Sequence, residues 1–234
     1  MEPMESLAPI CPSVPEDQPK FSRCIQSPTV PVIVGHELPD PPQTFYLHSG
    51  LLSKASSYFR AALKPDQFVE GQKWKVELDD VNPDIFGFFV EWLYRDGWGN
   101  LSEIPQLHET TVPLFVRVYA LGERLFCPRM QDAAADIVYR SLDEMGSSYS
   151  DTVVCDLVEI TESELGSRTS DDPLGDRILW LAVGRLEKLQ EFDRFTALVQ
   201  EHDQLATHIC MRAGSKGWHG KRKSGSRFKR ETAY

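Results

Sequence analysis

The chain has 234 residues, of which 41% are hydrophobic and 26% charged, and its formal net charge is −10. This length suits one domain of ordinary size with extensions, or two small domains, and it supplies enough apolar side chains for a core. The longest nearly uninterrupted apolar run, IFGFFV at 85–90, is far shorter than the roughly 20 residues that cross a bilayer, so we expect no membrane segment.

Residues 1–28 are rich in proline and polar side chains and show little periodicity, which predicts a disordered N-terminal segment. The start of the sequence has neither a basic leader nor an apolar stretch, so we expect no secretory signal or transit peptide and assign the chain to the nucleus or the cytoplasm. The five cysteines are scattered without a CxxC pair, and we expect them to be free thiols.

Three short strands are predicted in the first third of the chain. TVPVIVG at 29–35 is β-branched and ends at a glycine, and FYL at 45–47 follows a loop rich in Pro and Asp. WKVEL at 74–78 places Trp, Val and Leu on one face.

Helices are predicted between and after these strands. Apolar residues at helical spacing indicate one helix over 51–63, with Ser49 as its N-cap. Helix start signals at Asn82-Pro83, Thr111-Val112-Pro113 and Cys127-Pro128 each precede an apolar stripe. The order of elements predicts the α+β class, with a small sheet capped by a helical cluster.

Residues 144–211 are predicted to form a C-terminal helical extension with a linker. TVVCDLVEI at 152–160 fits a strand by its β-branched content and a helix by its spacing, and the helix is favoured because helices precede it. EITESELGSRTSDDP at 159–173 is expected to be a solvated linker.

The sequence from Asp176 to Ala206 is predicted to be helical, with a stripe that drifts, so the helix either bends near Gln190 or contacts different partners along its length. This stretch either packs on the preceding core or offers a docking surface. Packing is favoured, because apolar stripes usually face a core.

Residues 212–234 form a basic segment with eight Lys or Arg and one acid, a net charge of +7, so the preceding residues sum to −17. The acidic body disfavours a nucleic-acid groove, whereas this tail, predicted to be disordered, could act as a separate basic arm. The residues assigned to nucleic-acid binding or to a nuclear address are Lys221, Arg222, Lys223, Arg227, Lys229 and Arg230.

Three stretches carry a resemblance to a known family. FYLHSGLLSKASSYFR at 45–60 resembles the F-x-V-H-x-x-L-L-x-x-x-S-x-Y-F signature of BTB/POZ domains. WKVELDDVNPDIFGFFVEWLYRDGW and VPLFVRVYALGERLFCPRMQDAAADIV resemble the blocks that follow it, in the same order. The resemblance covers residues 29–143, and within this family the chain is most similar to fungal BTB proteins.

The resemblance implies a non-enzymatic protein–protein interaction module, acting as an adaptor or as a self-associating scaffold that forms a homodimer. The implied protein partners are cullin-type ubiquitin ligase scaffolds or chromatin-linked complexes. Phe68-Val69-Glu70 stands where adaptors that engage cullins carry an apolar-x-Glu stretch, which assigns Phe68 and Glu70 to partner binding. From its residues alone this segment is a loop, and an aromatic in it is either tucked onto the core, which is favoured, or offered outward. The s-D-v that precedes the first strand in many members is absent, so a corepressor groove is not carried over.

The neighbours His48 and Ser49 raise the alternative of an enzyme. Nucleophilic catalysis needs a nucleophile, a base and an orienting acid within reach, and LHSGLL lacks the G-x-S-x-G frame. We therefore interpret His48 as the end of the second strand and predict no catalytic residue, no metal site and no cofactor. The alternative function that remains is a nucleic-acid-associated or nuclear regulatory protein acting through the basic tail.

Overall fold

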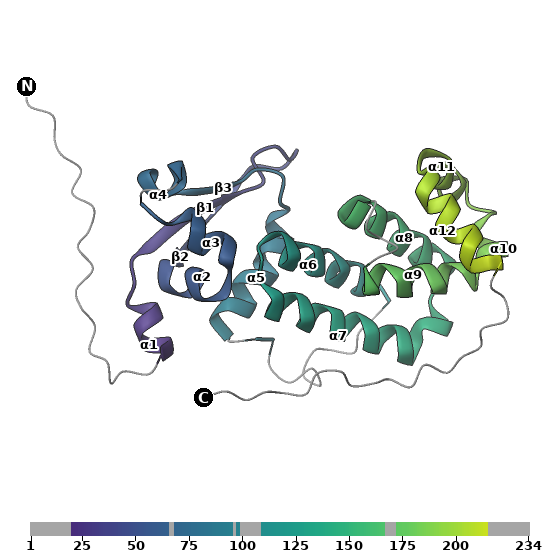
Figure 1. Cartoon of the computed structure of the whole chain (residues 1–234), viewed down its shortest axis with the longest axis horizontal. Helices are drawn as coiled ribbons and strands as arrows, with labels where there is room; N and C mark the ends of the chain where they lie inside the picture. The colour runs from purple at the N-terminus through teal and green to yellow at the C-terminus, as the bar shows by residue number, and fades with distance from the viewer. Residues whose placement is uncertain (1–19, 66–67, 96, 99–108, 167–171, 215–234) are drawn as a thin grey trace, which may run out of the picture.

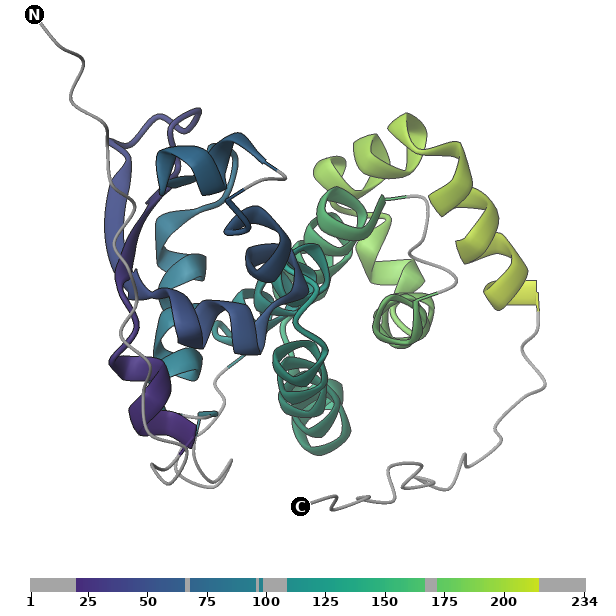
Figure 2. The same ribbon diagram turned by 60° about the vertical axis from the view of Figure 1, so that its left-hand side comes forward.

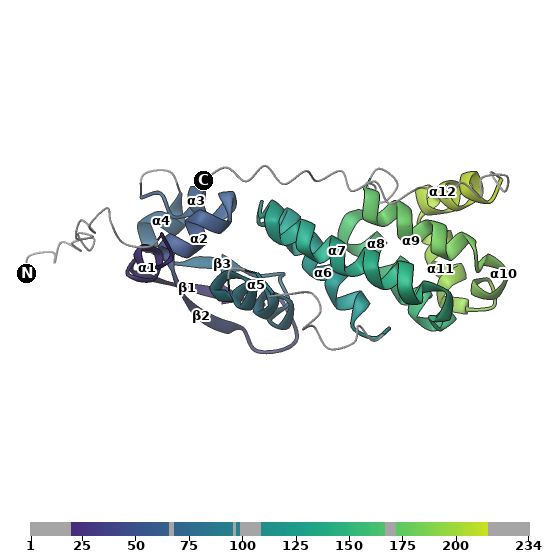
Figure 3. The same cartoon turned by 90° about the horizontal axis from the view of Figure 1, so that it is seen from below.

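The computed structural model describes residues 20–65, 68–95, 97–98, 109–166 and 172–214. A small sheet with short helices lies at one end of the molecule, three longer helices follow, and a helical extension forms the other end (Figure 1). Seen from below, this arrangement is elongated (Figure 3). The α+β class predicted from the sequence is confirmed.

The sheet has three strands in the order β2-β1-β3. Its strands are β1 (Thr29–Val34), β2 (Gln43–His48) and β3 (Val76–Leu78). β1 pairs antiparallel with β2 and parallel with β3. The alternating residues Val30, Val32 and Val34 are fully buried, so one face of the central strand packs on the helices.

Four short helices cover this end of the molecule: α1 (Lys20–Ile25), α2 (Ser49–Ala55), α3 (Ser57–Ala62) and α4 (Val69–Lys73). The prediction of one helix over 51–63 is wrong, because the chain is extended at Ser56. The buried Ser56 hydroxyl accepts the amide of Phe59 and donates to the carbonyl of Leu125, which ends one helix and caps the next. Ser49 is also not an N-cap but the first residue of α2.

The helical cluster consists of α5 (Pro83–Arg95), α6 (Val112–Arg124) and α7 (Pro128–Met145), which begin at the three predicted start signals. The Asn82 side chain accepts the amides of Asp84 and Ile85, as expected of a cap. An aromatic core joins α5 to α3, since the rings of Phe59 and Phe89 stack with centroids 5.8 Å apart.

The extension contains a short 3-10 turn η1 (Gly146–Ser148) and the helices α8 (Asp151–Leu165), α9 (Pro173–Val183), α10 (Leu186–Leu189), α11 (Asp193–Glu201) and α12 (Asp203–Gly214). Figure 2 places α9 to α12, in green and yellow, on the other side of α6 and α7 from the sheet. α8 packs on α6, and α9 packs on α8. The start of α9 is also tied to the cluster, through the hydrogen bond from Tyr119 to Asp172 and the ion pair between Arg177 and Asp143.

Several boundaries in the extension differ from the predictions. Residues 152–160 are helical, as favoured, but α8 continues to Leu165, so the expected linker begins later than Glu159. The helix predicted over 176–206 is divided into four, because the chain turns at Gly184, after Gln190 and at His202.

The two ends of the described chain also differ in part from the predictions. α1 lies inside the segment predicted to be disordered, and α12 continues to Gly214, past the predicted start of the tail at 212. No helix in the described part of the chain is long and apolar enough to span a bilayer.

Candidate partner-binding surface

Hydrogen bonds to distant residues hold the His48–Ser49 corner in place. His48 ends β2, as predicted, and its Nδ1 atom lies 2.7 Å from the hydroxyl of Tyr94 on α5. The same hydroxyl accepts the backbone N–H of His48 at 3.2 Å, and the N–H of Ser49 donates to the carbonyl of Pro28. These contacts fix where β2 passes into α2. Among the described residues, no group of three or more His, Cys, Asp or Glu could hold a metal ion.

Phe68 and Val69 project from the start of α4, with 49% and 57% of their surfaces exposed. Two predictions for this segment are wrong, since residues 69–73 are helical rather than a loop, and Phe68 is not tucked onto the core. Gly71 provides the reason. A Cβ atom there would lie 2.2 Å from the carbonyl oxygen of Lys64, so α4 meets the body of the protein through its backbone at Gly71. Phe68 and Val69 consequently face outward.

Glu70 is half-buried and lies near Tyr58 of α3. Burial raises the pKa of the Tyr58 phenol, the Glu70 carboxylate raises it further, and the Arg124 guanidinium lowers it. Glu70 of α4 and Arg124 at the end of α6 therefore both lie close enough to act on Tyr58.

A second exposed aromatic, Phe126, stands in the turn between α6 and α7 with 66% of its surface exposed. Its carbonyl accepts the N–H of Ser57 at 3.2 Å, so the turn is tied to the start of α3 beside Tyr58. The sequence interpretation did not single out Phe126. A signal was present, because Phe126 follows the last residue of the α6 stripe and directly precedes the Cys127-Pro128 helix start.

The backbone of Phe126 is left-handed, with φ of 48°. The N–H of Phe126 donates to the carbonyl of Glu123 at 2.9 Å, and the N–H of Cys127 donates to that of Gly122 at 2.8 Å. This pair of hydrogen bonds is the Schellman end of a helix, in which glycine is the usual left-handed residue. A phenylalanine in this conformation costs about 1–2 kcal/mol.

A groove of about 750 Å³ begins beside Phe126 and runs between the β3–α5 connection, α6 and α8. Arg124 forms a bidentate ion pair with Asp80 on its rim, with Nη1 2.7 Å from Oδ2. Arg117 also lines the groove, and its buried Nε has no hydrogen-bond partner among the described residues. Burial raises the pKa of Glu164, while Arg117 and Arg124 oppose that rise.

Several carboxylates lie near Tyr58. Asp79 and Asp80 lie close enough to raise the pKa of Tyr58, and Glu37 and Glu77 line the same depression of about 250 Å³. We call the surface formed by Tyr58, Phe68, Val69, Glu70 and Phe126 the aromatic face. It offers apolar anchors with carboxylates on the side of Tyr58 and the Asp80–Arg124 ion pair beside Phe126.

The cations predicted to bind nucleic acid, Lys221, Arg222, Lys223, Arg227, Lys229 and Arg230, lie outside the described residues. Arg212, counted in the basic tail from the sequence, belongs to α12, and its Nε lies 3.1 Å from Oδ1 of Asp176. It is therefore part of the folded extension.

Comparison with known proteins matches residues 31–112 to the BTB/POZ domain. The chain is similar to Kelch-like protein 40 of Xenopus laevis, with 26% identity over 152 residues, covering 56% of this chain and 24% of the relative. It is also similar to Kelch-like protein 40 of Xenopus tropicalis, with 27% identity over 116 residues, covering 40% of this chain and 19% of the relative. The chain thus spans a quarter or less of the length of these relatives. Both relatives are amphibian, and the fungal similarity stays a prediction.

Proposed function

We propose that this chain, in which residues 31–112 match the BTB/POZ domain, is a non-enzymatic adaptor that docks a protein partner on its aromatic face. A BTB/POZ domain supports protein–protein interaction as the general role. The proposed partner is a cullin-type ubiquitin ligase scaffold, because Phe68-Val69-Glu70 stands where BTB adaptors that engage cullins carry their apolar-x-Glu stretch.

The exposure of Phe68 and Phe126 carries this proposal. Both rings are held outward by backbone contacts at neighbouring sites, one through Gly71 and the other through the Schellman turn. Large aromatics in rigid surroundings are the residues that most often dominate binding energy. The adjacent groove offers room for a further segment of the partner.

The carboxylates near Tyr58 bear on the chemistry of the partner. Glu70 and Asp79 lie near the Tyr58 phenol, so the matching surface should carry Lys or Arg on that side of its apolar centre. Charges at the rim of an interface act mainly on the association rate and make it dependent on salt.

The direct test measures binding of a purified cullin-type scaffold to the wild type and to three variants, with a melting curve for each. Phe68→Ala and Phe126→Gly should each weaken binding by about 30-fold, equivalent to about 2 kcal/mol. Met211→Ala is the control, since Met211 is 70% exposed but lies on α12. Glycine is chosen at 126 because it relieves the left-handed strain, so its melting temperature should not fall.

Absence of binding by the wild type would end the ligase proposal. Equal dissociation constants for the wild type and both variants would exclude the aromatic face as the docking site. Weaker binding by Phe68→Ala together with a much lower melting temperature would assign Phe68 a structural role instead.

A separate observation favours self-association as an additional role. β2 is an edge strand on which Tyr46 is 70% exposed, and Phe21 and Ile25 are exposed on α1 nearby in the fold. We propose that this apolar surface meets a second copy of the chain. Light scattering should give the mass of a dimer for the wild type and that of a monomer for Phe21→Asp, whereas a wild-type monomer would contradict it.

The basic tail gives the second candidate function, binding of nucleic acid or another polyanion, or nuclear targeting. It rests on the seven Lys and Arg between 216 and 230, interleaved with Trp218 and Phe228. Since α12 ends at Gly214, a chain ending there should keep its melting temperature but lose retention on a phosphate column or nuclear distribution. Unchanged retention and unchanged distribution would together exclude this role.

A further inference from the structure

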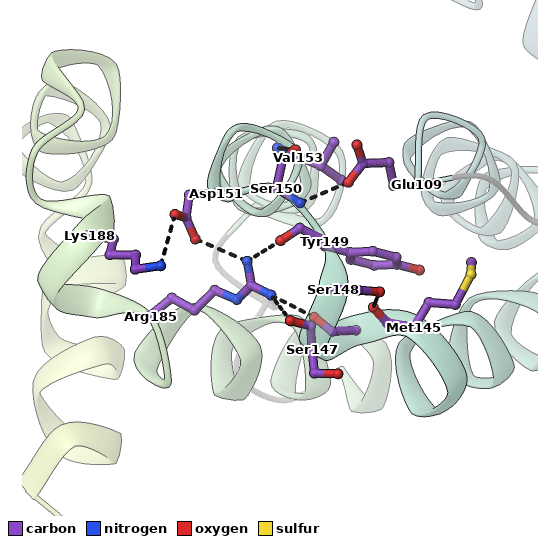
Figure 4. Close-up of polar contacts among 11 residues, drawn as sticks. Glu109, Met145, Ser147, Ser148, Tyr149, Ser150, Asp151, Val153, Arg185 and Lys188 are labelled. Carbon is purple, nitrogen blue, oxygen red and sulfur yellow. Dashed lines mark hydrogen bonds and ion pairs between the residues drawn. The ribbon is translucent and has the colours of Figure 1, made fainter.

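One side chain near each end of the described chain joins several elements. In the extension it is Arg185, between α9 and α10, which borders a groove of about 860 Å³. Its guanidinium donates to the carbonyls of Gly146 and Ser147, each at 2.9 Å, and to that of Tyr149, and it lies 3.0 Å from an oxygen of Asp151 (Figure 4). A guanidinium is always charged, so these donors are always present.

Near the other end the joining group is a hydroxyl, that of Ser27, which ties α1 to α2. It donates to the carbonyl of Cys24 at 2.6 Å and accepts the N–H of Gly50 at 2.8 Å. Gly50 is the second residue of α2, and His48, the N-cap of that helix, makes no capping hydrogen bond through its side chain. Ser27, which precedes Gly50 by 23 positions, therefore satisfies a donor at the start of α2.

The two helices meet closely at this point. A Cβ atom on Gly50 would lie 2.9 Å from the Ser27 Oγ atom and 3.1 Å from the Cα atom and the carbonyl oxygen of Cys24. Any group that replaces the hydroxyl hydrogen of Ser27 would be directed at the carbonyl of Cys24. The Ser27 side chain must then turn away, which breaks its contact with Gly50 as well.

Helix α1 is held in a way that permits local opening. It has six residues, too few for a helix that is stable by itself. Phe21 and Ile25 are 40% and 39% exposed, so much of its apolar surface is already in water. The Nε atom of Arg23 is buried without a hydrogen-bond partner among the described residues, and opening would hydrate it. Elements of this kind open at a lower free energy than the core.

The sequence at Ser27 fits a class of modifying enzyme. Ser27-Pro28 is the one place in the chain where a serine or threonine directly precedes proline. Proline-directed kinases require this pair, and proline keeps the preceding residue extended, as a bound substrate must be. Ser27 lies before the BTB/POZ match at 31–112, and the sequence interpretation assigns it no role.

We propose that Ser27 is a phosphorylation site for a proline-directed kinase, and that its phosphorylation keeps α1 off α2. In the open state the Ser27 Oγ atom attacks the γ-phosphorus of ATP held by the kinase. A new O–P bond forms, the bond from the γ-phosphorus to the β–γ bridging oxygen breaks, ADP leaves, and the hydroxyl proton passes to the catalytic base of the kinase. The product has no hydrogen on Oγ to donate to Cys24, and it carries a charge of about −1.5 to −2.

Release of α1 would also move Phe21 and Ile25 away from β2. These side chains belong to the surface proposed to meet a second copy of the chain, so phosphorylation should oppose self-association. This consequence rests on the proposed self-association, whereas the modification itself does not.

The first experiment treats the full chain with a purified proline-directed kinase and ATP and locates the phosphate by mass spectrometry. The wild type should acquire it at Ser27, and Pro28→Ala should lose it there. Gly50→Ala pushes α1 away and should raise the initial rate at Ser27 about tenfold, whereas Gly87→Ala, with open space around its added Cβ, is the matched control and should leave it unchanged. No phosphate on Ser27 of the wild type or Gly50→Ala would overturn the proposal, and so would equal rates for these two proteins.

The second experiment measures trypsin cleavage after Arg23 in the unmodified and the phosphorylated chain. Each rate is divided by the rate for the same protein unfolded in urea, which removes any direct effect of the phosphate on trypsin. Phosphorylation should raise this ratio about 30-fold, equivalent to about 2 kcal/mol, the scale of two hydrogen bonds. Equal ratios would overturn the proposal. A lower ratio after phosphorylation would also overturn it, because the phosphate would then hold α1 in place.

Light scattering on the same two samples separates this proposal from self-association. Phosphorylation should convert a dimer into a monomer. A monomer already present in the unmodified wild type would contradict self-association alone, and the phosphate position and the cleavage ratio would still decide the role of Ser27.

Discussion

Two glycine-to-alanine substitutions test how α4 holds the aromatic face. At Gly71 the new Cβ would lie 2.2 Å from the carbonyl oxygen and 2.7 Å from the carbonyl carbon of Lys64. Both are backbone atoms, so no side chain can rotate away, and α4 must move by about 1 Å to restore an ordinary contact. Gly87 on α5 has no atom within 4 Å of its added Cβ and is the matched control.

The two substitutions should have opposite signs. Overpacking against backbone costs about 1–3 kcal/mol, whereas alanine in an open helical position gains about 0.5–1 kcal/mol over glycine. For a chain of this size, 1 kcal/mol corresponds to about 2–4 °C in the melting temperature. Gly71→Ala should therefore melt roughly 2–12 °C lower than the wild type, and Gly87→Ala about 1–4 °C higher.

Thermal unfolding followed by circular dichroism measures both shifts on the same day and in the same buffer. Gly71→Ala should also weaken partner binding, because α4 carries Phe68. A Gly71→Ala protein that melts like Gly87→Ala would refute the close approach of α4 to Lys64. The argument for why Phe68 faces outward would then fail with it.

Three further predictions follow from individual contacts. Phe89→Ala removes a fully buried ring that stacks on Phe59 and should cost about 3–5 kcal/mol, whereas the exposed Phe68→Ala should melt within a few degrees of the wild type. The hydrogen bonds from Arg124 lower the pKa of Asp80, so this pair stabilises the protein above the usual carboxyl pKa and loses its effect as the pH falls through the folded value. A double-mutant cycle between Asp80 and Arg124 should show coupling at pH 7 that decreases as the pH is lowered. Arg185→Lys leaves carbonyls of the η1 turn without donors and should cost about 2–3 kcal/mol in denaturant unfolding, and an unchanged midpoint would contradict it.

The elements that the sequence predicted correctly are those with strong local signals. Pro83, Val112 and Pro128 begin helices where Asn-Pro, Val-Pro and Cys-Pro signals stood, and each helix has a regular stripe. The breaks that were missed depend on distant partners. Ser56 interrupts the expected helix because its hydroxyl meets the carbonyl of Leu125, 69 positions away, which no local pattern reveals.

The candidate site, too, was predicted only in the part that a pattern within one segment reveals. Phe68 was found through the resemblance, but its exposure was predicted wrongly, because the contact between Gly71 and Lys64 is visible only in three dimensions. The second half of the aromatic face, at Phe126, depends on the hydrogen bond between its carbonyl and Ser57. A pattern within one segment does not predict that two segments meet.

Two aromatic residues in the described part of the chain have positive φ, and they differ in what the protein gains from them. Trp74, with φ of 51°, ends α4, and its indole donates to the carbonyl of Thr29 at 3.1 Å, so its side chain joins α4 to β1. Phe126 has φ of 48° and leaves about two thirds of its surface exposed. Glycine would end α6 with the same hydrogen bonds and without the strain. The contacts within the protein therefore explain why a tryptophan stands at position 74, but not why a phenylalanine stands at position 126. A strained, exposed aromatic residue beside a groove is the arrangement expected where a binding partner supplies the missing contacts.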